Sequence, residues 1–336
     1  MEIYGTDPAP AEGEYALYAV YGGGNQADYL YGNGYPTVTV HGCDNSIEYV
    51  YGGGNAAAVK STNVTIWGGN VIGNVFGGGH GYKEPSPDGV GADVNGDVSV
   101  TIYGGTIGKV FGGSNTLGNI TGGINLTINK EGECSMHIDE VYGGGNEAAG
   151  NAGIINIGCT GGEDEGIGDV YGGANAADIN SDITLNITGG NINNVFGGNN
   201  TSGNILGEIT VNVENTGACG LNVNNVYGAG NKAAYGSDGD RKGNFPQVNI
   251  KSGTVNENVY GGGLGTTAVV YGNPQVTMTQ ESMIATTVGN IFGGGNAAEV
   301  KGNTSVNITG GNVLHNVYGG GNQANVTGQT NVVIGQ

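Results

Sequence analysis

The sequence predicts an all-β repeat protein, because one short motif recurs along its whole length. The motif is an apolar residue, an aromatic residue and then glycines, and it usually closes on Asn, as in residues 20–25 (Val-Tyr-Gly-Gly-Gly-Asn). It occurs eleven times, and successive copies start 25 to 35 residues apart. A repeat of this period indicates stacked units that bury apolar surface only against their neighbours.

The motif predicts two columns of like side chains. Aromatic rings stack at adjacent-strand spacing, and Asn side chains hydrogen-bond to their copies in the next turn. The aromatic column contains Tyr21, Tyr51, Phe76, Phe111, Tyr142, Tyr171, Phe196, Tyr227, Tyr260, Phe292 and Tyr318. The Asn column contains Asn25, Asn55, Asn115, Asn146, Asn175, Asn200, Asn231, Asn296 and Asn322. We expect the glycines to provide positive φ and close backbone approach at a corner, and Asn to tolerate a left-handed backbone.

Short alternating segments follow the motif, as in Val64-Thr65-Ile66, and such alternation is typical of a half-buried strand. A further apolar residue, such as Ile72, stands three positions before the motif start in ten of the eleven repeats. These patterns predict a single-stranded parallel β-helix of about eleven coils of 25–35 residues, with three short strands per coil. The crossovers are expected to be right-handed. A β-propeller fits eleven such repeats poorly.

Composition narrows the class of protein. Of the 336 residues 73 are glycine, and the formal net charge is −20. A chain this acidic is not expected to bind nucleic acid or anionic membrane, and no apolar run is long enough for membrane insertion. We expect one continuous array over residues 1–336, cut from a longer protein with further repeats at either end. Insertions near 81–97 and 235–245 are expected to form surface loops.

The aromatic and Asn columns resemble those of right-handed parallel β-helix proteins. The pattern looks most like the glycine-rich repeats of large secreted bacterial surface proteins and adhesins. The resemblance implies a non-enzymatic structural or adhesive role at an extracellular or cell-surface location. It implies a carbohydrate, or a host or bacterial surface protein, as the partner.

Few residues are candidates for chemistry, and no catalytic residue is predicted. His80 lies in a Gly-His-Gly motif like that of polygalacturonases, but it occupies the Asn position of its repeat, which favours a structural role. The remaining ligand-binding candidates are Asp238, Asp240 and Arg241 in the second insertion. No cofactor is expected. Asp93, Asn95 and Asp97 offer oxygens at alternate positions, as calcium loops do, so calcium is the alternative left open.

Two alternative functions remain open. Polysaccharide lyases and hydrolases also include β-helices. An outward column that contains Thr39, Thr65, Thr101 and Thr127 would suit an ice-binding solenoid, although it changes to Asn further along the chain.

The four cysteines are expected to be small buried residues rather than disulfide partners. Cys43, Cys134 and Cys219 each stand seven residues before a motif, in separate turns. Cys134 and Cys219 are three turns apart, which straight stacking places roughly 15 Å from each other, too far for a bond. Cys134 and Cys159 lie in consecutive turns and could meet.

Overall fold

The computed structural model describes residues 1–7, 11, 13–30, 32, 34–83 and 89–335. The predicted all-β parallel β-helix is confirmed, as a solenoid of about ten turns. Among the described residues there is no helix that could cross a membrane. The chain divides into two compact units. Unit 1 is Met1–Ile155 with Thr160–Gly168, and unit 2 is Asn156–Cys159 with Asp169–Gln336.

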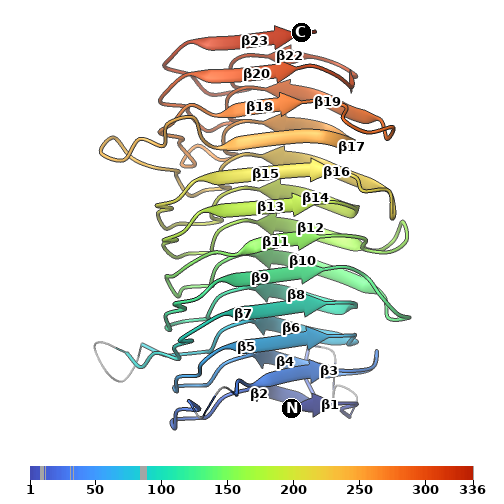
Figure 1. Cartoon of the computed structure of the whole chain (residues 1–336), viewed down its shortest axis with the longest axis vertical. Helices are drawn as coiled ribbons and strands as arrows, with labels where there is room; N and C mark the ends of the chain where they lie inside the picture. The colour runs from blue at the N-terminus through green and yellow to red at the C-terminus, as the bar shows by residue number, and fades with distance from the viewer. Residues whose placement is uncertain (8–10, 12, 31, 33, 84–88, 336) are drawn as a thin grey trace. The chain divides into compact units, whose positions relative to one another are not determined.

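Unit 1 contains two parallel sheets, which we call sheet A and sheet B. Sheet A contains β1 (Glu2–Ile3), β3 (Thr37–Val40), β5 (Thr62–Ile66), β7 (Val98–Ile102) and β9 (Ile124–Ile128). Sheet B contains β2 (Leu17–Tyr21), β4 (Ser46–Tyr51), β6 (Val71–Phe76), β8 (Gly105–Phe111) and β10 (Met136–Tyr142). Each strand pairs with the strand two places later in the chain, for example β2 with β4, so the chain alternates between the two sheets (Figure 1).

Unit 2 repeats this arrangement. Its sheet A contains β13 (Ile183–Ile187), β15 (Ile209–Glu214), the first part of β17 (Gln247–Tyr260), β18 (Gln275–Met278), β20 (Thr304–Ile308) and β23 (Thr330–Ile334). Its sheet B contains β14 (Gly190–Phe196), β16 (Leu221–Tyr227), the second part of β17, β19 (Thr286–Phe292), β21 (Asn312–Val313) and β22 (Val317–Tyr318). β11 (Ile154–Ile157) and β12 (Gly166–Tyr171) contain residues of both units.

The turns have a third side, but in the described residues it is formed by isolated bridging residues rather than by the third strand of the prediction. Val59, for example, pairs in parallel with Val94 and is fully buried. It stands nine positions after the motif start at Val50. The glycines and small residues of the motif form bends around these positions, so only isolated residues reach ladder geometry there, usually one per turn, with Ala176 and Ile179 both bridging in one turn.

The motif glycines are required for close approach and not for positive φ. A Cβ on Gly52 would lie 2.4 Å from the carbonyl oxygen of Gly77 and 2.8 Å from Cγ2 of Val64. None of the motif glycines has positive φ, and no other residue type among those described has it. The expectation that Gly and Asn supply left-handed backbone at this corner is therefore wrong. The corner is tight because the backbones of successive turns touch.

The aromatic column forms in both units. Neighbouring ring centroids lie 4.6–5.0 Å apart, with planes within 14° of parallel, from Tyr21 to Tyr142 in unit 1 and from Tyr171 to Tyr318 in unit 2. This separation matches the spacing of parallel strands, so the rings stack because the strands that carry them pair in register.

The Asn residues at the ends of the motifs form ladders. Asn55 Nδ2 donates to Asn25 Oδ1 over 2.8 Å in unit 1. In unit 2, Asn231 donates to Asn200 over 2.9 Å, and Asn322 donates to Asn296 over 2.8 Å. Each ladder bond joins side chains on successive turns, so it stabilises the stacking of those turns.

The structure contains two disulfides, contrary to the prediction. Cys43 bonds to Cys134 in unit 1, and Cys159 bonds to Cys219 in unit 2. No cysteine is free, and Cys134 does not pair with Cys159. The prediction failed because it assumed that equivalent positions of successive turns stack in straight columns, one strand spacing per turn. The corners that carry the cysteines differ in length from the corners between them.

Each disulfide joins two long corners across shorter glycine corners. In unit 1 the corners at 41–45 and 129–135 hold the cysteines, while the intervening corners at 67–70 and 103–104 contain glycines. A Cβ on Gly68 would lie 2.3 Å from Cys134 Sγ, so the bridge passes directly over that corner. In unit 2 a Cβ on Gly189 would lie 2.5 Å from Cys219 Sγ.

Candidate functional site

The insertion at 235–245 holds three of the predicted ligand-binding residues and projects from unit 2 beside β17 (Figure 1). It begins at Tyr235, which bridges to Val270 on the third side of the turn. Its tip is closed by two backbone hydrogen bonds between Ser237 and Asp240, of 3.0 and 3.1 Å. The chain then enters β17, so both ends of the loop are anchored in paired backbone.

Arg241 is the single arginine of the chain, and three contacts orient it. Its Nη2 lies 2.8 Å from Asp238 Oδ1, and its Nη1 donates to the carbonyl of Lys301. Its guanidinium carbon lies 5.5 Å from the ring centroid of Tyr271. The side chain is half exposed, so the ion pair contributes little stability, but the contacts set the direction of the guanidinium.

Lys242 is the residue of this site that the sequence analysis missed. Only 5% of its side chain is exposed, and its Nζ lies 2.6 Å from Asp240 Oδ2 and 3.1 Å from the carbonyl oxygen of Leu206. The ammonium also lies 5.6 Å from the ring centroid of Tyr235. A buried ammonium requires such partners, because desolvation of an unpaired charge is costly. The available signal was Arg241-Lys242, the one adjacent pair of cations in the sequence.

These side chains surround a cavity of about 440 Å³, lined by residues 206–208, 235 and 240–245. Tyr235 is buried in its wall and donates its hydroxyl hydrogen to the Gly207 carbonyl over 3.0 Å. Burial raises the pKa of this phenol far above its usual value, so it stays protonated. Glu208 lines the same cavity together with Asp240. The cavity therefore offers carboxylates as hydrogen-bond acceptors, with the nearby cations already paired.

His80 lies in unit 1, in the Asn ladder. Its Nδ1 lies 2.9 Å from Asn55 Oδ1, and its ring centroid lies 5.4 Å from that of Tyr51. Burial lowers the pKa of His80, which favours the neutral imidazole. The side chain thus takes the place of Asn in the column, and the structure does not bring it together with Asp238, Asp240 or Arg241.

The three metal candidates lie at the end of the first insertion, of which residues 84–88 are outside the described residues. Asp93 Oδ1 accepts the backbone N–H of Asn119 over 2.8 Å, and Asp97 Oδ1 accepts that of Gly123 over 2.9 Å. Asn95 is exposed. Both aspartates therefore cap backbone donors of the next turn. Over the described ranges, no group of three or more His, Cys, Asp or Glu could hold a metal ion.

Asp178 and Asp182 of unit 2 make the same kind of bond to the next turn, of 2.7 and 2.8 Å. The capping of backbone amides by a preceding aspartate is thus a recurring feature of the turns and does not mark Asp93 and Asp97 as a separate site.

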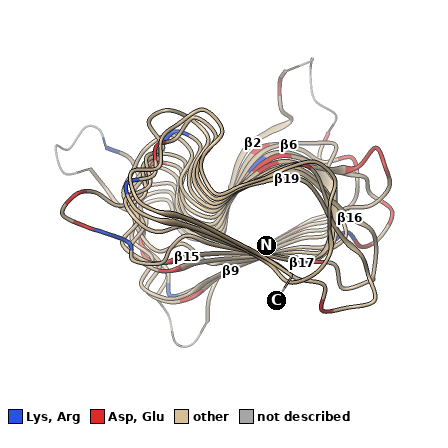
Figure 2. Ribbon diagram, turned by 90° about the horizontal axis from the view of Figure 1, so that it is seen from above, with Lys and Arg blue, Asp and Glu red and all other residues tan. Residues whose placement is uncertain are grey.

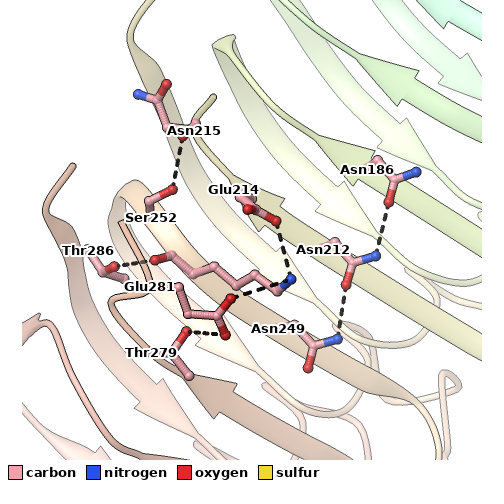
Figure 3. Close-up of polar contacts among 10 residues, drawn as sticks. Asn186, Asn212, Glu214, Asn215, Asn249, Ser252, Thr279, Glu281 and Thr286 are labelled. Atoms are coloured by element: carbon pink, nitrogen blue, oxygen red, sulfur yellow. Dashed lines mark hydrogen bonds and ion pairs between the residues drawn. The ribbon is translucent and has the colours of Figure 1, made fainter. Parts of the chain in front are cut away.

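The outward face of sheet A carries polar side chains in register. In unit 2, Asn212 donates to Asn186 and Asn249 donates to Asn212, each over 3.0 Å (Figure 3). Beside this ladder, the ammonium of Lys251 lies between Glu214 at 3.2 Å and Glu281 at 3.9 Å. The acidic and basic residues lie mostly on loops and bends outside the strands (Figure 2), so the strand faces themselves are largely uncharged.

The geometry defines a parallel β-solenoid repeat protein with a charged loop and uncharged polar faces. No family model, curated protein or solved structure matched the chain.

Proposed function

We propose that this chain is a non-enzymatic structural and adhesive repeat segment of a bacterial secreted or cell-surface protein, in which it presents binding surfaces. The observation that carries the proposal is the pair of disulfides, Cys43–Cys134 and Cys159–Cys219. Disulfides form and persist in oxidising environments and are rare in the cytosol. Two of them in a chain with four cysteines support a location outside the cytoplasm.

The outward faces support a binding role. In unit 1, Thr39, Thr65, Thr101 and Thr127 are aligned on successive sheet A strands. Together with the Asn ladder of unit 2, they provide rows of hydroxyl and carboxamide groups. Such groups hydrogen-bond to sugars and to polar protein surfaces. A net charge of −20 disfavours anionic partners, so a neutral carbohydrate or a surface protein suits these faces best.

The alternative of a polysaccharide lyase or hydrolase has one specific observation in its favour. Glu208 and Asp240 line the same cavity, and Lys242 is buried beside them. Carboxylates placed around a substrate site are the usual groups for general acid and base catalysis of glycoside cleavage.

A glycan array combined with lyase and hydrolase assays on the same polysaccharides distinguishes the two functions. We expect selective binding without turnover. Turnover of any polysaccharide would overturn the non-enzymatic proposal, and thermal hysteresis would favour the ice-binding alternative. Thiol labelling of the native protein taken directly from cells tests the location, because we expect all four cysteines to be blocked until a reductant is added.

A further inference from the structure

A shallow groove continues from the charged loop along the edge of unit 2 at which the sheet A strands begin. It has a volume of about 190 Å³ and is lined by residues 244, 273–275, 303–305, 329 and 331. Asn244 lines both this groove and the 440 Å³ cavity at 206–208 and 240–245. The two hollows therefore meet at the base of the insertion.

One wall of the groove is held by hydrogen bonds between turns. Asn273 Nδ2 donates to Asn244 Oδ1 over 3.3 Å, and Asn273 Oδ1 accepts the backbone N–H of Asn303 over 2.8 Å. Asn303 Oδ1 in turn accepts the backbone N–H of Gln329 over 2.8 Å. This wall is thus ordered before any ligand arrives, which lowers the entropic cost of binding.

The other wall carries hydrogen-bonding side chains with no internal partner. Gln275, Ser305 and Asn331 are in register on β18, β20 and β23, at a strand spacing of about 4.8 Å. Within the part of the chain that the structure describes, none of these three side chains makes a hydrogen bond. The groove therefore presents one unused polar group per turn beside the ordered wall.

We propose that this groove binds an extended chain of neutral, hydroxyl-rich sugars. Amide and hydroxyl groups donate to and accept from sugar hydroxyls, and a polymer with a short repeat suits a groove that repeats its polar groups at every turn. The inference rests on the proposed function and deepens it by naming the ligand class and its site.

Charge excludes acidic sugars from this groove. Arg241 and Lys242, the cations beside it, are already paired with Asp238 and Asp240. Glu208 and the net charge of −20 would repel a polyanion.

An extended peptide fits the groove less well. Peptides bind to sheets by pairing with a free strand edge, or they place apolar side chains in pockets. β18 and β20 are hydrogen-bonded on both sides, and the groove is lined mainly by polar residues. Along β18 and β20, neither mode of peptide recognition is therefore available; β23 pairs only with β20 among the described strands.

Titration calorimetry with the whole chain tests the inference. The probes are linear hexasaccharides of β1,4-linked glucose, xylose and N-acetylglucosamine, with an oligogalacturonate as the acidic comparison. The groove variant combines Gln275→Ala with Asn331→Ala, and neither side chain makes an internal hydrogen bond that would be lost. The matched control combines Thr277→Ala with Asn307→Ala, which change side chains two residues beyond Gln275 and Ser305 on the same strands, outside the groove.

We expect at least one neutral hexasaccharide to bind the wild type. The groove variant should bind it about tenfold more weakly, as the loss of two hydrogen bonds implies, and the control should stay within about twofold. A third variant, Ser305→Tyr, should block the groove and abolish binding. Circular dichroism and thermal unfolding of each variant check that the fold is retained.

Three results would overturn the inference. Equal binding by wild type and groove variant would place the glycan elsewhere and leave the proposed function intact. Preference for the oligogalacturonate would contradict the neutral ligand class. Failure of every glycan in the panel would count against both the groove as a sugar site and glycan adhesion.

Discussion

Removal of the Cys43–Cys134 disulfide tests whether the bond between two long corners, across the shorter glycine corners, stabilises the solenoid. The change is Cys43→Ala with Cys134→Ala, which leaves the second disulfide in place. The bridge joins residues 91 positions apart. The chain-entropy relation for a closed loop of that length gives a loss of about 4.6 kcal/mol of stability at 25 °C. Nearly all of this effect comes from the greater freedom of the unfolded chain.

The assay is urea unfolding without reductant, followed by the fluorescence of Trp67. This residue is the single tryptophan, and it lies on the corner beneath the bridge, next to Gly68. With an m value of about 2 kcal/mol/M, the midpoint should fall by about 2 M. The wild type in reductant is the comparison, and its midpoint should also fall.

Two findings would refute this reasoning. The first is that the wild type shows four reactive thiols when it is unfolded without reductant. This result would mean that the disulfides do not form. The second is a midpoint shift below about 0.5 M, because it would mean that the loop across the corners is not the constraint that the geometry implies.

Three further changes test the packing of the turns. Gly52→Ala should lower the free energy of unfolding by more than about 2 kcal/mol because its Cβ would overlap a carbonyl oxygen, whereas Gly150→Ala, with no atom within 4 Å, should be nearly neutral. Phe111→Ala should cost about 3–5 kcal/mol in urea unfolding, because the ring is fully buried in the aromatic column. His80→Asn should remove an acid-sensitive component of stability. Burial lowers the pKa of His80 in the folded protein below the ordinary histidine value of about 6.5, so its contribution is present above about pH 6.5 and is lost as the pH falls. Thermal unfolding of the wild type and of His80→Asn should be compared at about pH 7.5 and about pH 5. The melting temperature should fall less for the variant than for the wild type as the pH is lowered.

Local periodicity was sufficient to predict most of the fold. The alternation in Val64-Thr65-Ile66 corresponds to the end of β5, with Val64 and Ile66 buried and Thr65 facing outward. The form of the third side was not predicted, because isolated residues such as Val59 form the bridges there instead of a strand. A single position has no alternation of its own and becomes visible only when whole turns are compared.

The candidate site was predicted in part. Asp238, Asp240 and Arg241 do lie together, because they share one short insertion. Lys242 was missed because a lysine in a polar loop is normally solvated. Its burial depends on the Leu206 carbonyl and the Tyr235 ring, which belong to other parts of the unit. The groove at Gln275 and Ser305 was missed for the same reason, since it exists only between turns.

By itself, the sequence determined the turn period, the inward apolar positions and the aromatic and Asn columns, because each of these repeats at a fixed phase along the chain. Only the tertiary structure decided which cysteines bond, why the motif glycines are required and where the charged loop meets the groove. The physical reason is that these features depend on corner lengths and on contact between the backbones of successive turns. Cys43 and Cys134 are 91 residues apart, and they meet because two long corners cross over the glycine corners between them.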